Sequence, residues 1–121
     1  FELILSYFPE LEKRLSSATV LLSGGEQQMV VLGRALAGDP KYLLIDEMSL
    51  GLAPVVFMRL LQVLEQVASA GVGILLVEQF AHLALGISSD ALVVSNGKVS
   101  YHGVPKVLLK DEEMLNQAYM G

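Results

Sequence analysis

The chain has 121 residues, of which 53% are hydrophobic and 17% charged, a composition that allows one domain with a packed core and excludes a disordered chain. Cysteine is absent, which excludes disulfides and thiolate metal sites. The formal net charge is -5 at pH 7, and both signs are mixed along the chain without a basic stripe, so we expect no binding to nucleic acid.

The N-terminal end lacks the features of a targeting segment. No apolar run approaches the length of a membrane span, and no basic region precedes a long apolar core as in a secretion signal. The first residue is Phe1 rather than Met, so we expect the chain to begin inside a longer protein. Its high apolar content fits this expectation, because a fragment exposes surfaces that the remainder covers.

The first segments are predicted to be short and helical. Residues 1–8 predict a helix that ends at Pro9, because proline disfavours helical backbone in the residue before it. Residues 10–14 predict an exposed turn or a short helical piece, and a polar connection follows.

A longer helix is predicted from Gly25 to about Gly38. Apolar residues recur three or four positions apart along it, which places them on one face. Ser23 can cap its start, and Glu26 follows at the spacing of a capping box. Glycine and proline after the last apolar residue close it.

Two apolar runs, residues 42–45 and 73–77, predict strands that are buried on both faces. Between them, Pro54 suits the first turn of a helix over residues 55–70, which has a polar stripe on one side. Strand, helix and strand in this order predict a parallel pair with a right-handed crossover. We therefore expect an α/β layered domain whose ligand lies beyond the carboxyl ends of the strands.

The C-terminal part predicts a hairpin surrounded by helices. Asn96-Gly97 is the strongest short hairpin signal, because both turn positions need positive φ. The expected elements are a helix over 80–87, strands over 91–95 and 99–102, a helix from Pro105, and a last helix from Asp111 to about Tyr119.

An acidic pair, Asp46-Glu47, follows the first strand, as Glu78-Gln79 follow the second. A carboxylate at Asp46 could hold Mg²⁺, often through water. Glu47 could orient an attacking water or accept its proton as a general base. The alternative is a solvated strand end, where Asp and Glu are common.

The glycine-rich stretch before the long helix is a candidate anion site. Ser23, Gly24 and Gly25 leave backbone N–H groups accessible at a helix start, where the helix dipole adds positive charge. The glycines let a phosphate approach without a side-chain clash. The alternative is a capping box with no ligand.

Together these two motifs resemble those of the ATP-binding subunits of ABC transporters. Residues 22–27 match the signature motif, residues 42–46 match the Walker B strand, and Glu47 stands in the place of the catalytic glutamate. The resemblance implies the C-terminal portion of a P-loop NTPase domain, with parallel core strands, flanking helices and a C-terminal β-hairpin. Residues 1–38 would end the helical subdomain, and residues 39–121 would form the Walker B half of the core.

The resemblance also implies a composite site for ATP and Mg²⁺ between two subunits. The chain would give one site Asp46, which holds Mg²⁺ via water, and the catalytic residues Glu47 and Gln79. It would give the partner subunit's ATP the signature residues Leu22, Ser23, Gly24, Gly25 and Glu26.

Four shorter sequence segments resemble the branched-chain amino acid uptake branch of this family. The segments concerned are residues 23–29, 49–54, 76–79 and the ending 117–121. This branch implies uptake of amino acids through membrane permease subunits, with a second ATP-binding subunit as direct partner and a solute-binding protein as an indirect one. The protein would lie peripherally on the cytoplasmic face of the membrane.

Departures from the general ABC pattern concern Met48, Ala53 and Gln79. Met48 replaces a proline and Ala53 replaces the usual D-loop aspartate, while Gln79 replaces the switch histidine. Glutamine can donate a hydrogen bond but cannot carry the imidazolium proton. The last two changes are typical of the branch, so we interpret them as variation. His82 and His102 have no second ligand at a metal-binding spacing, and we expect no metal there.

The sequence has no G-x-x-x-x-G-K-[ST] loop, which ABC ATPases need to hold the phosphates. Its only Gly-Lys pair, Gly97-Lys98, is followed by Val99, and Leu92 stands where the first glycine should be. The resemblance places the Walker A half before Phe1. We therefore expect the parent protein to hydrolyse ATP and the isolated chain not to.

Two other functions stay open. One is an ABC-type ATPase for another solute or outside transport, although DNA-repair and chromosome members flank their signature with coiled coils and no heptad run occurs here. The other is an inactive fragment that only keeps the fold, in which Glu47 would be dispensable.

Overall fold

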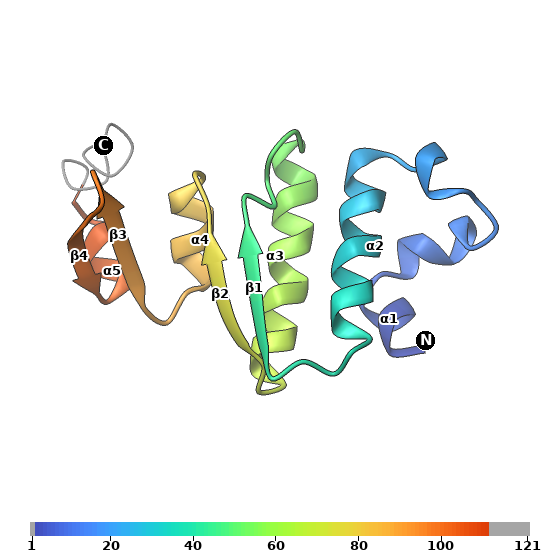
Figure 1. The fold of residues 1–121 in the computed structure, drawn as a ribbon, viewed down its shortest axis with the longest axis horizontal. Helices are drawn as coiled ribbons and strands as arrows, with labels where there is room; N and C mark the ends of the chain where they lie inside the picture. Colours follow the sequence, from blue (N-terminus) through green and yellow to red (C-terminus); the bar gives the residue numbers. More distant parts are fainter. Residues whose placement is uncertain (1, 112–121) are drawn as a thin grey trace. The chain divides into compact units, whose positions relative to one another are not determined.

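The computed structural model describes residues 2–111, and its contacts divide it into two compact units after Val77 (Figure 1). The first unit contains helices α1 (Glu2–Tyr7), α2 (Gly24–Leu36) and α3 (Pro54–Ser69), 3-10 helices η1 (Pro9–Arg14) and η2 (Thr19–Leu21), and strands β1 (Tyr42–Asp46) and β2 (Gly73–Val77). The second contains α4 (Ala81–Ile87), β3 (Ala91–Ser95), β4 (Lys98–Gly103) and α5 (Pro105–Leu108). Of the last helix, expected from Asp111 to about Tyr119, everything after Asp111 lies outside the described residues, as does the ending 117–121. The subdomain division at residues 38 and 39 stays a prediction.

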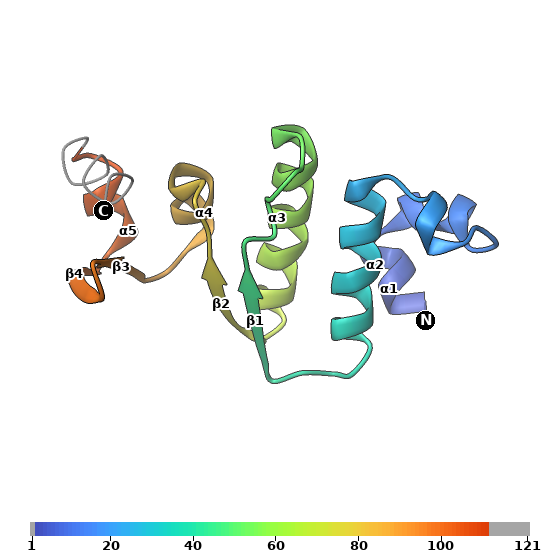
Figure 2. The ribbon, with the colours of Figure 1, turned by 45° about the horizontal axis from the view of Figure 1, so that its top comes forward.

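Strands β1 and β2 form the expected parallel pair, with Tyr42 opposite Gly73 and Asp46 opposite Val77. Helix α3 connects them and runs alongside β1 in both views (Figures 1 and 2). The α/β class and the strand–helix–strand unit are therefore confirmed. Since Asp46 pairs with Val77, the chain leaves both strands at the same edge of the sheet.

The prediction that these strands are buried on both faces is wrong for the described structure. Leu43 is buried, but its neighbours Tyr42 and Leu44 are 75% and 74% exposed, and Leu75 and Val77 are also exposed. Successive side chains of a strand point to opposite faces, so one cover buries only every second residue. Within the described part of the first unit, the other face of the sheet stays open.

Helix α2 packs closely against its neighbours near both of its ends. A Cβ atom at Gly25 would lie 2.5 Å from Val56 Cγ1 of α3, and one at Gly33 would lie 2.7 Å from Ile4 Cγ2 of α1. Figure 1 shows α2 beside α3. Both glycines therefore allow α2 to approach its neighbours more closely than any other residue would.

The second unit is a hairpin with two helices. Strands β3 and β4 are antiparallel, and Asn96 and Gly97 of the turn have φ of 50° and 72°, which confirms the predicted hairpin. Its small core joins Ala91 of β3 to Leu108 of α5. No helix in residues 2–111 combines the length and apolar character that a membrane span needs.

Candidate nucleotide site

The glycine-rich stretch forms a complete capping box at the start of α2. Ser23 Oγ accepts the Glu26 N–H at 3.3 Å, and Glu26 Oε2 accepts the Ser23 N–H at 2.8 Å. The Ser23 hydroxyl also lies 2.8 Å from Glu26 Oε2 and donates to it. The predicted cap is therefore confirmed. It fixes the serine hydroxyl and the helix start in one geometry.

Glu26 also bonds to Arg14 from η1, whose Nε lies 2.8 Å from Glu26 Oε1. The Ser23 N–H, the Arg14 guanidinium and the Ser23 hydroxyl, in that order, lower the pKa of Glu26 from 4.5 to about 2. Glu26 is therefore a carboxylate throughout the physiological pH range, at the positive end of a helix.

The chain entering α2 is fixed by Gln27. Its Nε2 donates to the carbonyl of Leu22 at 3.1 Å and to that of Thr19 at 3.3 Å. Leu22 itself is buried. These bonds fix the backbone before Ser23, which holds the glycine stretch in place.

The acidic pair lies at the carboxyl edge of the sheet. Asp46 ends β1 and is exposed, and Glu47 follows with φ of 47°. The Glu47 N–H still donates to the Val77 carbonyl at 2.9 Å, so the backbone leaves the sheet only after this residue. A non-glycine residue with positive φ is uncommon and is a frequent mark of a functional position.

A tight loop joins the acidic pair to α3 and reaches the signature stretch. Met48 and Ser49 are buried, and Gly51 has φ of 74°. A Cβ atom at Gly24 would lie 3.7 Å from Leu52 Cδ2 of this loop. The first unit therefore brings the loop after the acidic pair into contact distance of the α2 start.

Known proteins resemble the chain over nearly its whole length. The family model described as ABC transporter matches residues 4–49. The high-affinity branched-chain amino acid transport ATP-binding protein BraG of Pseudomonas aeruginosa is 42% identical over 98% of this chain and 50% of its own length. The chain is thus similar to ABC transporter ATP-binding proteins. A probable branched-chain amino acid transport protein, LivF of Archaeoglobus fulgidus, is 34% identical over 90% of this chain and 47% of its own length.

Other ABC relatives differ in named role. The lipopolysaccharide export protein LptB of Escherichia coli K12 is 34% identical over 83% of this chain and 41% of its own length. An ABC transporter ATP-binding cassette crystallised in its ADP conformation has a TM-score of 0.83 and 26% identity, over 98% of this chain and 47% of that one. The chain thus spans about half the length of the curated relatives it matches.

The first unit holds Ser23 to Glu26 and the pair Asp46-Glu47. Gln79 lies in the second unit, where its carbonyl accepts the Ala81 N–H at 2.8 Å. That Gln79 donates a hydrogen bond to the phosphate on which Glu47 acts stays a prediction. In the described residues no group of three or more His, Asp or Glu could hold a metal. Asp46 is a single exposed carboxylate, which suits Mg²⁺ that keeps several waters.

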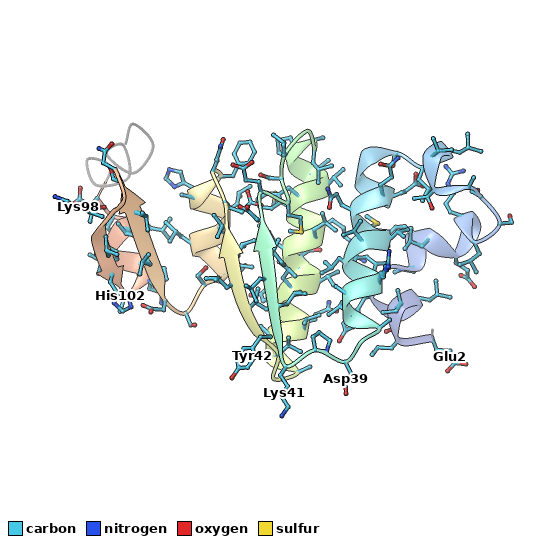
Figure 3. All side chains as sticks on the ribbon, in the orientation of Figure 1. Glu2, Asp39, Lys41, Tyr42, Lys98 and His102 are labelled. Carbon is cyan, nitrogen blue, oxygen red and sulfur yellow. The ribbon has the colours of Figure 1, made fainter. Side chains whose placement is uncertain are left out.

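His102 forms an exposed ion pair in the second unit, whereas the signature stretch and the acidic pair belong to the first. His102 on β4, labelled in Figure 3, lies 2.8 Å from Asp90, and both side chains are 63% exposed. Sequence reasoning missed Arg14 and the anchoring role of Gln27. Arg14 lies twelve positions before Glu26, so no helical or strand periodicity links them.

Proposed function

We propose that the full-length protein, meaning this chain joined to a Walker A half, is the ATP-binding and ATP-hydrolysing subunit of an importer for branched-chain amino acids. The observation that carries the ATPase proposal is the first unit itself, which holds a capped signature helix and an acidic pair at the sheet edge. The amino acid proposal rests on the 42% identity to BraG.

The α2 start suits a phosphate group. The capping box uses the N–H groups of Ser23 and Glu26. The first N–H groups of a helix have no intrahelical partners, and in α2 this leaves those of Gly24 and Gly25 for a ligand. Together with the helix dipole they attract an anion. We infer that this stretch contacts the ATP whose other phosphate contacts come from the partner subunit.

The sheet edge suits the hydrolytic step. Bound Mg²⁺ would neutralise charge on the phosphates, and the exposed carboxylate of Asp46 would hold it through water. Glu47 would orient the attacking water and accept its proton. Gln79 would donate a hydrogen bond to the same phosphate group, without the charge of a histidine.

The partners follow from the divided site. A second ATP-binding subunit must face the signature stretch, since this chain lacks a Walker A loop. Permease subunits would carry the solute, with a solute-binding protein delivering it. The protein would then lie on the cytoplasmic face of the membrane as a peripheral subunit.

The test of the ATPase proposal is Glu47→Gln in the full-length protein. The variant should bind ATP with unchanged affinity and lose hydrolysis, since the amide cannot accept the water's proton. Glu65→Gln is the matched control, because Glu65 is exposed on α3. Unchanged turnover in Glu47→Gln would remove the catalytic assignment and favour a chain that only keeps the fold. Turnover by the purified 121-residue chain would overturn its proposed inactivity.

Export of another solute is the second candidate, because LptB also matches. Uptake of labelled leucine with the cognate permease and binding protein separates the two. Uptake that depends on ATP and on Glu47 supports import of branched-chain amino acids. Active hydrolysis without uptake of any amino acid would refute it.

A further inference from the structure

The proposed phosphate site contains a negative charge of its own. Glu26 Oε2 accepts both the N–H and the hydroxyl of Ser23, each at 2.8 Å. The Ser23 hydroxyl should contact the incoming phosphate, but here it donates its hydrogen bond to the Glu26 carboxylate. Two anions at one helix start repel each other unless a cation neutralises one of them.

Arg14 supplies that cation. Its Nε lies 2.8 Å from Glu26 Oε1, the carboxylate oxygen that Ser23 does not use. The remaining acidic residues of η1 are Glu10 and Glu12, and Glu10 is engaged by Arg59 of α3. Lys13 is the other basic residue of η1, and Arg14 is the one that pairs with Glu26 of the signature stretch.

The other end of η1 is attached to α3, which helps to fix the position of Arg14. Arg59 Nε donates to Glu10 Oε1 at 2.7 Å, and Arg59 Nη2 donates to the Tyr7 carbonyl at 2.6 Å. Arg59 also reaches the second oxygen of Glu10 at 3.3 Å. One end of η1 is thus attached to α3, while the other end carries Arg14 to α2.

We propose that Arg14 is a positioning residue for the signature site, which neutralises Glu26 so that the capping box can coexist with a bound phosphate. This inference rests on the proposed function. When Ser23 turns its hydroxyl to a phosphate oxygen, Glu26 keeps the Ser23 N–H and Arg14 as donors. Without Arg14, the carboxylate would keep the hydroxyl and repel the phosphate.

The test is the steady-state kinetics of the full-length protein at low salt. Arg14→Gln should raise the KM for ATP by roughly three- to thirty-fold at unchanged kcat, the range expected for a nearby charge at an exposed site. The increase should shrink at high ionic strength, because salt screens exposed charges. Arg14→Lys, which keeps the charge, should stay near the parental KM. Arg34→Gln, the same change on an exposed arginine at the other end of α2, is the control.

The double variant Arg14→Gln with Glu26→Gln separates neutralisation from simple packing. Removing both charges should lower the KM again relative to Arg14→Gln. A double variant no better than Arg14→Gln, or an Arg14→Gln protein whose KM matches that of Arg34→Gln, would overturn the proposal. These results are distinct from failure of the proposed function, which Glu47→Gln tests by loss of turnover.

Discussion

The adjacent signature glycines should respond differently to alanine. A Cβ atom at Gly25 would lie 2.5 Å from Val56 Cγ1, whereas one at Gly24 would lie 3.7 Å from its nearest neighbour, Leu52 Cδ2. Val56 is β-branched and has essentially one rotamer in a helix, so it cannot turn away. Gly25→Ala must therefore push α2 away from α3.

The magnitude follows from two opposing effects. Overpacking by one methyl group costs about 1–3 kcal/mol. Replacing glycine in a helix returns up to about 1 kcal/mol, and less in the first turn. We expect Gly25→Ala to lower the free energy of unfolding by about 1–2 kcal/mol, and Gly24→Ala to change it by less than about 0.5 kcal/mol.

The assay is urea unfolding of the full-length protein, combined with ATP turnover. Val56→Ala in the Gly25→Ala background should recover part of the lost stability, because it removes the clashing methyl groups. Gly24→Ala should lower turnover without lowering stability, since its side chain would occupy the approach path of a phosphate. Equal stability of the Gly24→Ala and Gly25→Ala proteins would refute the packing argument.

Three further predictions concern Glu26, Arg59 and Gly97. Because the pKa of Glu26 is lowered to about 2, its ionised form stabilises the fold above about pH 4.5, and this contribution is lost as the pH falls toward 2. In Glu26→Gln, the free energy of unfolding should therefore depend less on pH between about pH 5 and 2.5 than in the parent protein. Arg59→Gln should cost about 1–2 kcal/mol in urea unfolding, because it removes the bonds to Glu10 and to a backbone carbonyl. Gly97→Ala should cost about 1 kcal/mol in thermal unfolding, because φ is 72° there.

Each of these has a matched control in the chain. Glu65→Gln should keep the parental pH slope, and an unchanged slope in Glu26→Gln would contradict the capping-box assignment. Arg34→Gln should leave stability within about 0.5 kcal/mol, and an equal loss in both arginine variants would reject the Arg59 contacts. Gly86→Ala has no neighbour within 4 Å of the added carbon, and its φ is not positive. It should be neutral or stabilising where Gly97→Ala is not.

Local features could be predicted from the sequence because their partners are close along the chain. Ser23 and Glu26 are three residues apart, and Asn96 and Gly97 are adjacent in the turn that they form. In both cases the residues that determine the local structure are neighbours in the sequence. The parallel pairing of β1 and β2 followed from the connecting helix. Recognition of the family rested on the same local motifs.

Features that depend on distant residues could not be predicted. The pairs of Glu26 with Arg14 and of Glu10 with Arg59 span 12 and 49 positions, and no periodicity connects them. Burial of both faces of β1 was predicted wrongly, because a run of apolar residues shows that a strand prefers burial but not which element covers it. Tyr42, labelled in Figure 3, shows the result, with an aromatic side chain 75% exposed at the start of that strand.

The backbone conformation of Glu47 has a cost in stability at the residue that the proposed function makes catalytic. Its φ of 47° is a conformation that glycine or asparagine adopts at lower cost than glutamate. Selection for heat resistance alone would therefore not favour glutamate over glycine on backbone grounds, while Glu47→Gly would lose the proposed hydrolysis. Screens that read only expression or melting temperature would lose the residue on which the proposed chemistry depends.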